Sequence, residues 1–191
     1  TDVNVSGNGG AGISATGGTA TLTDVNVSGN GGAGLVASAG ADLTVRRSRF
    51  QSNGDRGLNL SDVTFDIENT LIGGLGEANQ DGTVIRSPRA GSRFVNNTVV
   101  GNVTSELNAA GIDCDGAFAI TNSILWNNEG GAGDVRNCDV STSSVGVDPM
   151  LSGGLHLTAA STCCVDQGTD TDAPADDIDG DERPCGEGID I

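Results

Sequence analysis

Two carboxylates and one arginine in the second half of the chain have types and a spacing that could support chemistry on a polysaccharide. Asp113 and Asp115 flank Cys114, and side chains two positions apart on a strand point to the same face. Arg136 follows about one repeat later and could approach both carboxylates. Glycoside hydrolysis needs two carboxyl groups about 5–10 Å apart, so a catalytic cluster is one interpretation of this pattern. The sequence favours the other interpretation, a solvated strand face with a structural cysteine between the carboxylates.

Two further clusters of charged residues could hold a ligand. The acidic run near the C-terminus includes Asp177, Asp179 and Asp181, and oxygen ligands at this density suit Ca²⁺. The spacing differs from that of an EF-hand loop, so the alternative is that these side chains cap turns. Four arginines could bind an acidic polysaccharide or contact an acidic neighbour, namely Arg46, Arg47, Arg49 and Arg56. Apart from Ca²⁺, we expect no cofactor.

Five cysteines lie in the second half of the chain: Cys114, Cys138, Cys163, Cys164 and Cys185. None belongs to a pair with zinc-site spacing, and the single histidine could not complete such a site. We therefore expect disulfides and an oxidising compartment, with buried free thiols as the alternative. Cys114 and Cys138 are about one repeat apart, which would stack their Cα atoms within the disulfide range of roughly 4.4–6.8 Å. Cys185 would then pair with Cys163 or Cys164, and one cysteine would stay unpaired.

The composition favours strands and turns, and it excludes several classes of function. Glycine contributes 31 of the 191 residues, aromatic residues only 3 %, and the formal net charge is −17. Gly, Thr, Ser, Asn and Val outweigh the strong helix formers. So acidic a chain lacks the basic surface that nucleic-acid binding requires. No apolar run is long enough to cross a bilayer as a helix.

An internal repeat organises the elements that must position these residues. The segment TDVNVSGNGGAG at 1–12 recurs unchanged at 23–34. Apolar residues alternate within each unit, which is typical of short strands, and units with one apolar face must stack to bury it. We expect one apolar column to run along the stack through Val5, Val27, Phe50, Ile72, Val100 and Leu125.

Asparagines recur at a fixed distance from this apolar column. Asn8, Asn30 and Asn53 each follow a column residue by three positions, and Asn102 and Asn127 fall near the same place in later units. Asparagine tolerates left-handed backbone, and its amide can hydrogen-bond a stacked copy in the next unit. The pattern therefore predicts an asparagine ladder that stabilises the turns, with a binding loop as the alternative.

These patterns predict an all-β protein, a right-handed parallel β-helix whose solenoid has about six coils over residues 1–145. Loops should leave the coils at insertions 74–83, 104–110 and 128–134. A leucine-rich repeat is the nearest alternative, but its Leu-x-x-Leu-x-Leu signature is missing. Residues 146–191 depart from the repeat and predict a loop-rich, disulfide-stapled capping region packed on the last coils.

The C-terminal region resembles the closing segment of bacterial secreted β-helix proteins with a choice-of-anchor Q domain. The resemblance covers roughly residues 95–191, and NSILWNN at 122–128 looks like a coil of these proteins. One run of matching residues is Asp148, Pro149, Leu155, Leu157, Ser161, Val165, Asp166 and Gly168. A second is Asp177, Asp179, Gly180, Arg183, Pro184, Asp190 and Ile191. Thr162 stands where proline is usual, and Cys163–Cys164 add a residue. The resemblance implies an extracellular, surface-displayed protein and no particular reaction.

We therefore expect a secreted or cell-surface protein with a structural or adhesive role, in which no residue is required to act in catalysis. Because the chain opens in mid-repeat at Thr1, its first coil would present an unpaired edge. A second copy could cover that edge and give head-to-tail filaments. The expected partners are further copies of this chain or an extracellular polysaccharide. The alternative is a polysaccharide-binding or polysaccharide-degrading β-helix of the pectate-lyase type, acting through Asp113, Asp115 and Arg136.

Overall fold

Short segments with alternating burial form the strands of the structure, a computed structural model that describes residues 2–76, 78–116, 118–184 and 187–191. In strand β4 (Val25–Ser28), Val25 and Val27 are buried, whereas Asn26 between them is exposed. This alternation is what a strand with one face against a core requires. The described residues form 19 strands and no helix, so they contain no helix that could cross a membrane.

Each coil contributes three strands, and equivalent strands of successive coils pair in parallel to give three sheets. Sheet A contains β1 (Val3–Ser6), β4, β7 (Arg49–Gln51), β10 (Leu71–Gly73), β13 (Thr98–Val100), β16 (Ile124–Trp126) and β19 (Ser144–Val145). Sheet B contains β2 (Ile13–Thr16), β5 (Leu35–Ser38), β8 (Arg56–Ser61), β11 (Asp81–Arg86), β14 (Ile112–Asp115) and β17 (Val135–Arg136). Sheet C contains β3 (Thr19–Thr23), β6 (Asp42–Arg46), β9 (Thr64–Glu68), β12 (Arg93–Val95), β15 (Ala119–Thr121) and β18 (Asp139–Ser141).

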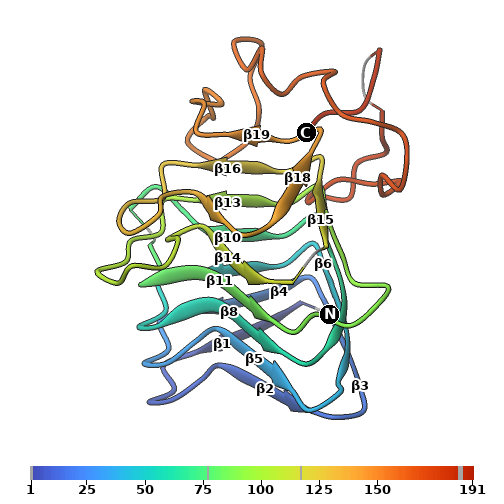
Figure 1. The fold of residues 1–191 in the computed structure, drawn as a ribbon. Coiled ribbons are helices and arrows are strands. Elements are labelled where there is room, and N and C mark those ends of the chain that lie inside the picture. The colour runs from blue at the N-terminus through green and yellow to red at the C-terminus, as the bar shows by residue number, and fades with distance from the viewer. Residues whose placement is uncertain (1, 77, 117, 185–186) are drawn as a thin grey trace.

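The three sheets form the sides of a right-handed parallel β-helix of about six coils, which confirms the predicted fold (Figure 1). The chain bends between sheets C and A at one left-handed residue per coil. These residues have φ between 42° and 55°, and they are Asp24, Arg47, Asn69, Asn96, Asn122 and Thr142. Asparagine and aspartate adopt this conformation more readily than other non-glycine residues. Because the bend recurs at the same place, successive coils stack in register.

The apolar column inside sheet A differs from the prediction in one coil. The strand register aligns Val5, Val27, Phe50, Ile72, Val99 and Leu125. Val100 was expected in this column, but it pairs with Gly73 and Trp126 instead. The expectation was wrong because Val99 and Val100 are both valine and both fully buried, so alternation does not reveal which one faces the column.

A ladder of asparagines runs along the stack beyond the strands of sheet A, and all its members except Asn8 are buried. Each follows its strand by two residues, except Asn79, which lies after an insertion. The Nδ2 atom of each amide donates to Oδ1 of the asparagine in the next coil, at 2.8–3.1 Å, through Asn8, Asn30, Asn53, Asn79, Asn102 and Asn128. The Asn128 amide donates in turn to Asp134 Oδ1 at 2.7 Å. Asn79 was not foreseen as a member. Asn127 is not in the ladder but holds a left-handed corner with φ 55°.

One disulfide joins neighbouring coils. Cys114 and Cys138 are bonded with a Cα–Cα distance of 5.3 Å, which confirms the stacking predicted from their spacing. Cys163 and Cys164 form no disulfide with another described cysteine, and burial raises the pKa of Cys164 to about 12. Cys185 lies outside the described residues, so its predicted bridge to Cys163 or Cys164 stays a prediction.

The described residues that follow β19 add no further strand to the sheets. In Figure 1 this segment passes over the last coil and then descends along one side of the stack. Its contacts extend to Asn69, and to Arg47 in the turn between β6 and β7. The region therefore contacts several coils of the stack, and its role as a cap on the last coils stays a prediction.

Candidate functional site

Strand β14 positions the predicted catalytic residues on the outside of sheet B. Ile112 and Cys114 belong to the interior apolar cluster, so Asp113 and Asp115 lie on the opposite, outer face. Arg136 of β17 is in direct register with Asp113. The structure thus brings Asp113 and Arg136 together, as the spacing of one coil predicts.

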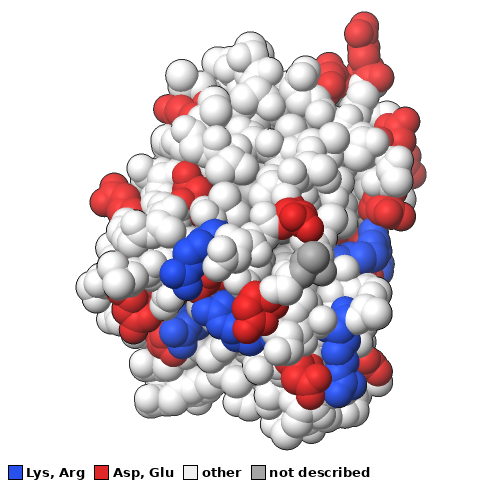
Figure 2. All heavy atoms as spheres, in the orientation of Figure 1, with Lys and Arg blue, Asp and Glu red and all other residues white. Residues whose placement is uncertain are grey.

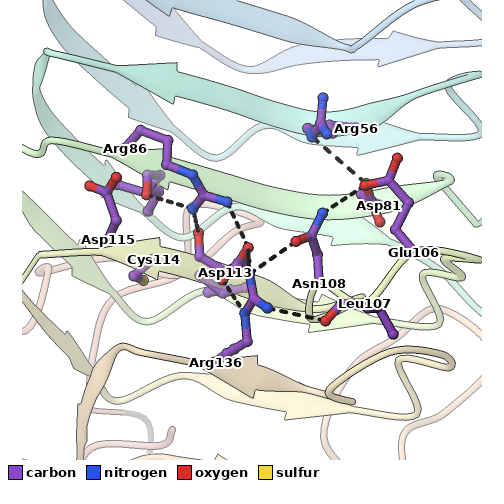
Figure 3. A network of polar contacts seen from close by, with 12 residues as sticks. Arg56, Asp81, Arg86, Glu106, Leu107, Asn108, Asp113, Cys114, Asp115 and Arg136 are labelled. Atoms are coloured by element: carbon purple, nitrogen blue, oxygen red, sulfur yellow. Dashed lines mark hydrogen bonds and ion pairs between the residues drawn. The ribbon is translucent and has the colours of Figure 1, made fainter.

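Two arginines from neighbouring coils enclose the Asp113 carboxylate (Figure 3). Arg136 donates from Nε to Oδ1 at 2.8 Å and from Nη2 to Oδ2 at 2.8 Å. Arg86 of β11, on the other side of β14, donates from Nη2 to Oδ2 at 2.7 Å. The Asp113 side chain is completely buried by these neighbours. Arg86 is the member of this cluster that the sequence reasoning missed.

The charge state of Asp113 follows from these contacts. Burial alone would raise the pKa of Asp113, but the hydrogen bonds and charges of Arg136 and Arg86 outweigh it and hold the pKa below its usual value. Asp113 is therefore ionised at neutral pH, with both oxygens engaged. A carboxylate in this state neither delivers a proton to a leaving group nor reaches a substrate as a base.

The Asp113 cluster fastens an insertion loop to the coils. Arg136 also donates to the Leu107 carbonyl at 3.1 Å and to Asn108 Oδ1 at 2.9 Å. Asn108 in turn donates to Glu106 Oε2 at 2.7 Å, so the chain of contacts runs from sheet B into loop 104–110. A buried carboxylate with two guanidinium partners is a rigid anchor, and this is the role that the contacts support.

Asp115 does not join Asp113 in a pair of catalytic carboxyls. Its Oδ1 atom accepts a hydrogen bond from the Ser87 amide at 2.6 Å, and its side chain is exposed. Figure 3 shows Asp115 to the side of Arg86, whereas Asp113 lies between Arg86 and Arg136. The two carboxylates share a sheet face but have separate partners.

An acidic cleft that no sequence motif indicated lies beside the loop. It has a volume of about 390 Å³, and its lining includes Asp55, Asp81, Thr104 and Glu106. Only 5 % of the Asp81 side chain is exposed, and Arg56 Nε lies 3.7 Å from its Oδ2. Burial raises the pKa of Asp81, and the charges of Glu106 and Asp55 also raise it, against opposing effects of Thr104 and Arg56. The lining comes from three coils with unequal spacing, so local patterns could not predict it.

The clustered arginines are engaged with carboxylates. Each of the four lies within 3.7 Å of at least one acidic partner: Arg46 with Asp66 and Glu68, Arg47 with Asp24 and Asp176, Arg49 with Asp179, and Arg56 with Asp55 and Asp81. On the face seen in Figure 2, arginine atoms lie beside carboxylates. These arginines join coils and loops, which is the second of the two roles expected for them.

The acidic run near the C-terminus is built around a turn. Asp177 Oδ1 accepts hydrogen bonds from the amides of Asp179 and Asp181, each at 2.9 Å. The Asp179 carboxylate instead faces His156, with Nδ1 to Oδ2 at 3.2 Å. Within the described ranges, no three His, Cys, Asp or Glu side chains are placed to hold a metal ion. The Ca²⁺ site at Asp177, Asp179 and Asp181 stays a prediction.

A second cavity, of about 250 Å³, lies between the outer face of sheet A and the C-terminal region. Thr98 and Ile124 line it from the sheet, and Leu155, His156 and Ile178 line it from the C-terminal region. The charged residues Asp177, Arg183 and Asp190 also line it, so its walls mix aliphatic and polar groups. The sequence did not indicate this cavity because its walls come from distant segments.

Comparison with known protein families gives one match. The family described as "Right handed beta helix region" matches residues 1–162, most of the chain and all six coils. Comparisons with curated proteins and with solved structures give no match. The family match agrees with the parallel sheets and leaves the role of the Asp113 cluster to be argued from its geometry.

Proposed function

The chain belongs to the right-handed β-helix family, and from this premise we propose that it is an extracellular, surface-associated structural or adhesive rod. The observation that carries the proposal is the state of Asp113, the best catalytic candidate in the sequence. Its carboxylate is buried and bound by Arg86 and Arg136, so it serves as an anchor for loop 104–110. Asp113, Arg86 and Arg136 thus stabilise the rod.

Several features support a rod that keeps its shape under load. The asparagine ladder spans all six coils, and every amide except that of Asn128 donates to the asparagine of the next coil. The Cys114–Cys138 disulfide joins two coils covalently, which suits an oxidising, extracellular location. Cross-links between coils resist separation of the coils along the axis of the stack.

We further propose that such rods associate end to end. Among the described residues, strands β1, β2 and β3 stand at the ends of their sheets, each paired with one neighbouring strand. Edge strands of this kind pair readily with strands of another chain. In β2 the Ile13 amide donates to Gly34 of the next coil, so the neighbouring Ser14 directs its backbone groups toward the free edge.

Light scattering on the purified chain at increasing concentration tests this association. A Ser14→Pro variant removes an amide donor from the free edge without removing a bond to the next coil, and Ser14→Ala is the matched control. We expect the mass of wild type and of Ser14→Ala to rise with concentration while Ser14→Pro stays at the mass of one chain. A wild type that stays monomeric, or a proline variant that assembles like wild type, would contradict the proposal.

The acidic cleft favours a second candidate function, the binding or degradation of a polysaccharide. Its residues would be Asp81, Asp55 and Glu106 rather than Asp113, because a buried carboxyl with a raised pKa is the type of group that acts as a general acid. Affinity electrophoresis and release of reducing ends on neutral and acidic polysaccharides test it. Binding or cleavage lost in Asp81→Asn supports this function, and no effect of the wild type on any polysaccharide rejects it.

A further inference from the structure

An acidic arm, defined as residues 169–184, lies along the corner between sheets C and A. Seven of its residues carry carboxylates, namely Asp170, Asp172, Asp176, Asp177, Asp179, Asp181 and Glu182, and Arg183 is its one basic residue. Backbone hydrogen bonds tie the arm to itself, from Ala173 to Asp170, from Asp177 to Asp181 and from Arg183 to Ala175. The arm therefore has local structure of its own.

Side chains of the coils hold the arm. Asn122 Nδ2 donates to the Thr169 carbonyl at 2.8 Å, and the Thr169 amide donates back to Asn122 Oδ1 at 3.0 Å. One coil along, Arg93 Nη2 donates to the Asp172 carbonyl at 2.8 Å. These contacts lie in different coils, so the arm runs along the axis of the stack.

The next contacts continue in the same direction. Asn69 Nδ2 donates to the Asp176 carbonyl at 2.8 Å, and Arg47 Nη1 donates to Asp176 Oδ2 at 2.6 Å. We name the four coil residues Arg47, Asn69, Arg93 and Asn122 the receptor row. Three of them hold left-handed corners, where the bend recurs in every coil and fixes the spacing of the row.

The chemistry of the receptor row defines what it can recognise. Its amides bind backbone carbonyls, which every peptide offers, whereas the Arg47 guanidinium selects a carboxylate. Because the contacts come from side chains at successive coils, the row suits an extended segment that lies parallel to the stack. An acidic peptide segment is the ligand that meets both requirements.

We propose that the receptor row is a binding surface for an extended acidic segment, and that the arm of a second copy of this chain can occupy it. The tethered arm has an effective concentration on the order of millimolar, so it fills its own row when intact. A copy whose own arm is displaced leaves the row open to the arm of another copy. This contact uses the side of the rod and is independent of association through its ends.

Exchange of charge between Arg47 and Asp176 tests the proposal. Arg47→Asp reverses one charge of the receptor row, and Asp176→Arg reverses one charge of the arm. Each variant therefore places like charges where its own arm meets its own row, which weakens docking within the chain. When the two variants are mixed, the reversed arm finds its complementary row only on the other chain. We expect an immobilised Asp176→Arg chain to capture Arg47→Asp, and the mixture to reach about twice the mass of either variant alone.

Two controls keep the test decisive. In the double variant Arg47→Asp/Asp176→Arg the pair is restored within one chain, so this variant should not be captured. Asp170→Arg makes the same charge change at a carboxylate that forms no ion pair with any described residue, and it should not capture Arg47→Asp. Circular dichroism of each variant establishes that it is folded. The proposal is overturned if the folded variants fail to form the mixed pair, or if Asp170→Arg captures Arg47→Asp as well as Asp176→Arg does. End-to-end association is distinguishable, because it would appear with the double variant as well.

Discussion

Replacement of Asn53 by alanine removes the centre of the asparagine ladder. The Asn53 amide donates to the Val27 carbonyl and to Asn79 Oδ1, both at 3.1 Å. Its Oδ1 atom accepts hydrogen bonds from the Asn30 backbone N–H at 3.3 Å and from the Asn30 side-chain Nδ2 at 3.0 Å. All four bonds are buried, so alanine removes buried partners from the polar groups of three neighbours.

The magnitude follows from the number of bonds. A hydrogen bond contributes about 1 kcal/mol net, so the loss of four buried bonds should lower the free energy of unfolding by about 4 kcal/mol. Asn53→Asp should cost at least as much, because the carboxylate would face the Val27 carbonyl and Asn79 Oδ1 with no proton to donate. The ladder places its one aspartate, Asp134, at the end, where only an acceptor is needed.

Urea unfolding followed by circular dichroism and by the fluorescence of Trp126 measures the effect. The matched control is Asn26→Ala in β4, whose side chain is exposed on the outer face, and it should change stability by no more than about 0.5 kcal/mol. If Asn53→Ala costs less than about 1 kcal/mol, or no more than Asn26→Ala, the ladder does not stabilise the coils as argued.

Three further predictions follow from the contacts. Arg136→Ala should lower the free energy of unfolding by about 2 kcal/mol, because Asp113 then keeps only Arg86 as an ionic partner. The same variant should be cleaved faster by protease in loop 104–110, which loses its bond to Arg136. An unchanged cleavage rate would contradict the anchoring role. Asp81→Asn should raise stability near neutral pH, because ionisation of this buried carboxyl is unfavourable in the folded protein. Urea unfolding should show that this gain fades as the pH falls through the raised pKa of Asp81, since the wild-type carboxyl then takes up a proton. A gain that is constant with pH would refute this prediction. Replacing both Cys114 and Cys138 by serine should cost about 3 kcal/mol in thermal unfolding without reductant, and wild type in reductant should match the variant.

Much of the fold is predictable from the sequence because the repeat of residues 1–12 at 23–34 fixes the length of one coil. Alternation within each unit then indicates the strands. The predicted residues of the apolar column and the asparagine ladder were wrong or incomplete where alternation and repeat spacing become irregular. Two adjacent valines, Val99 and Val100, hide the phase of alternation, and the insertion after β10 lengthens the spacing enough to obscure Asn79.

The site was predictable only in part. The spacing of one coil correctly placed Arg136 beside Asp113. Its role could not be predicted, because Arg86 comes from the preceding coil and Asn108 from a loop that folds back on the sheet. The contacts of Asp176 with Arg47 and Asn69 span more than 100 residues, and no local pattern reports contacts at that separation.

Negative-stain electron microscopy of the purified chain tests the central claim, a structural rod that assembles through its ends, most directly. The account predicts fibres about one β-helix wide, with coils stacked along the fibre axis at about 4.8 Å. Discrete particles of single-chain size at every concentration would contradict it.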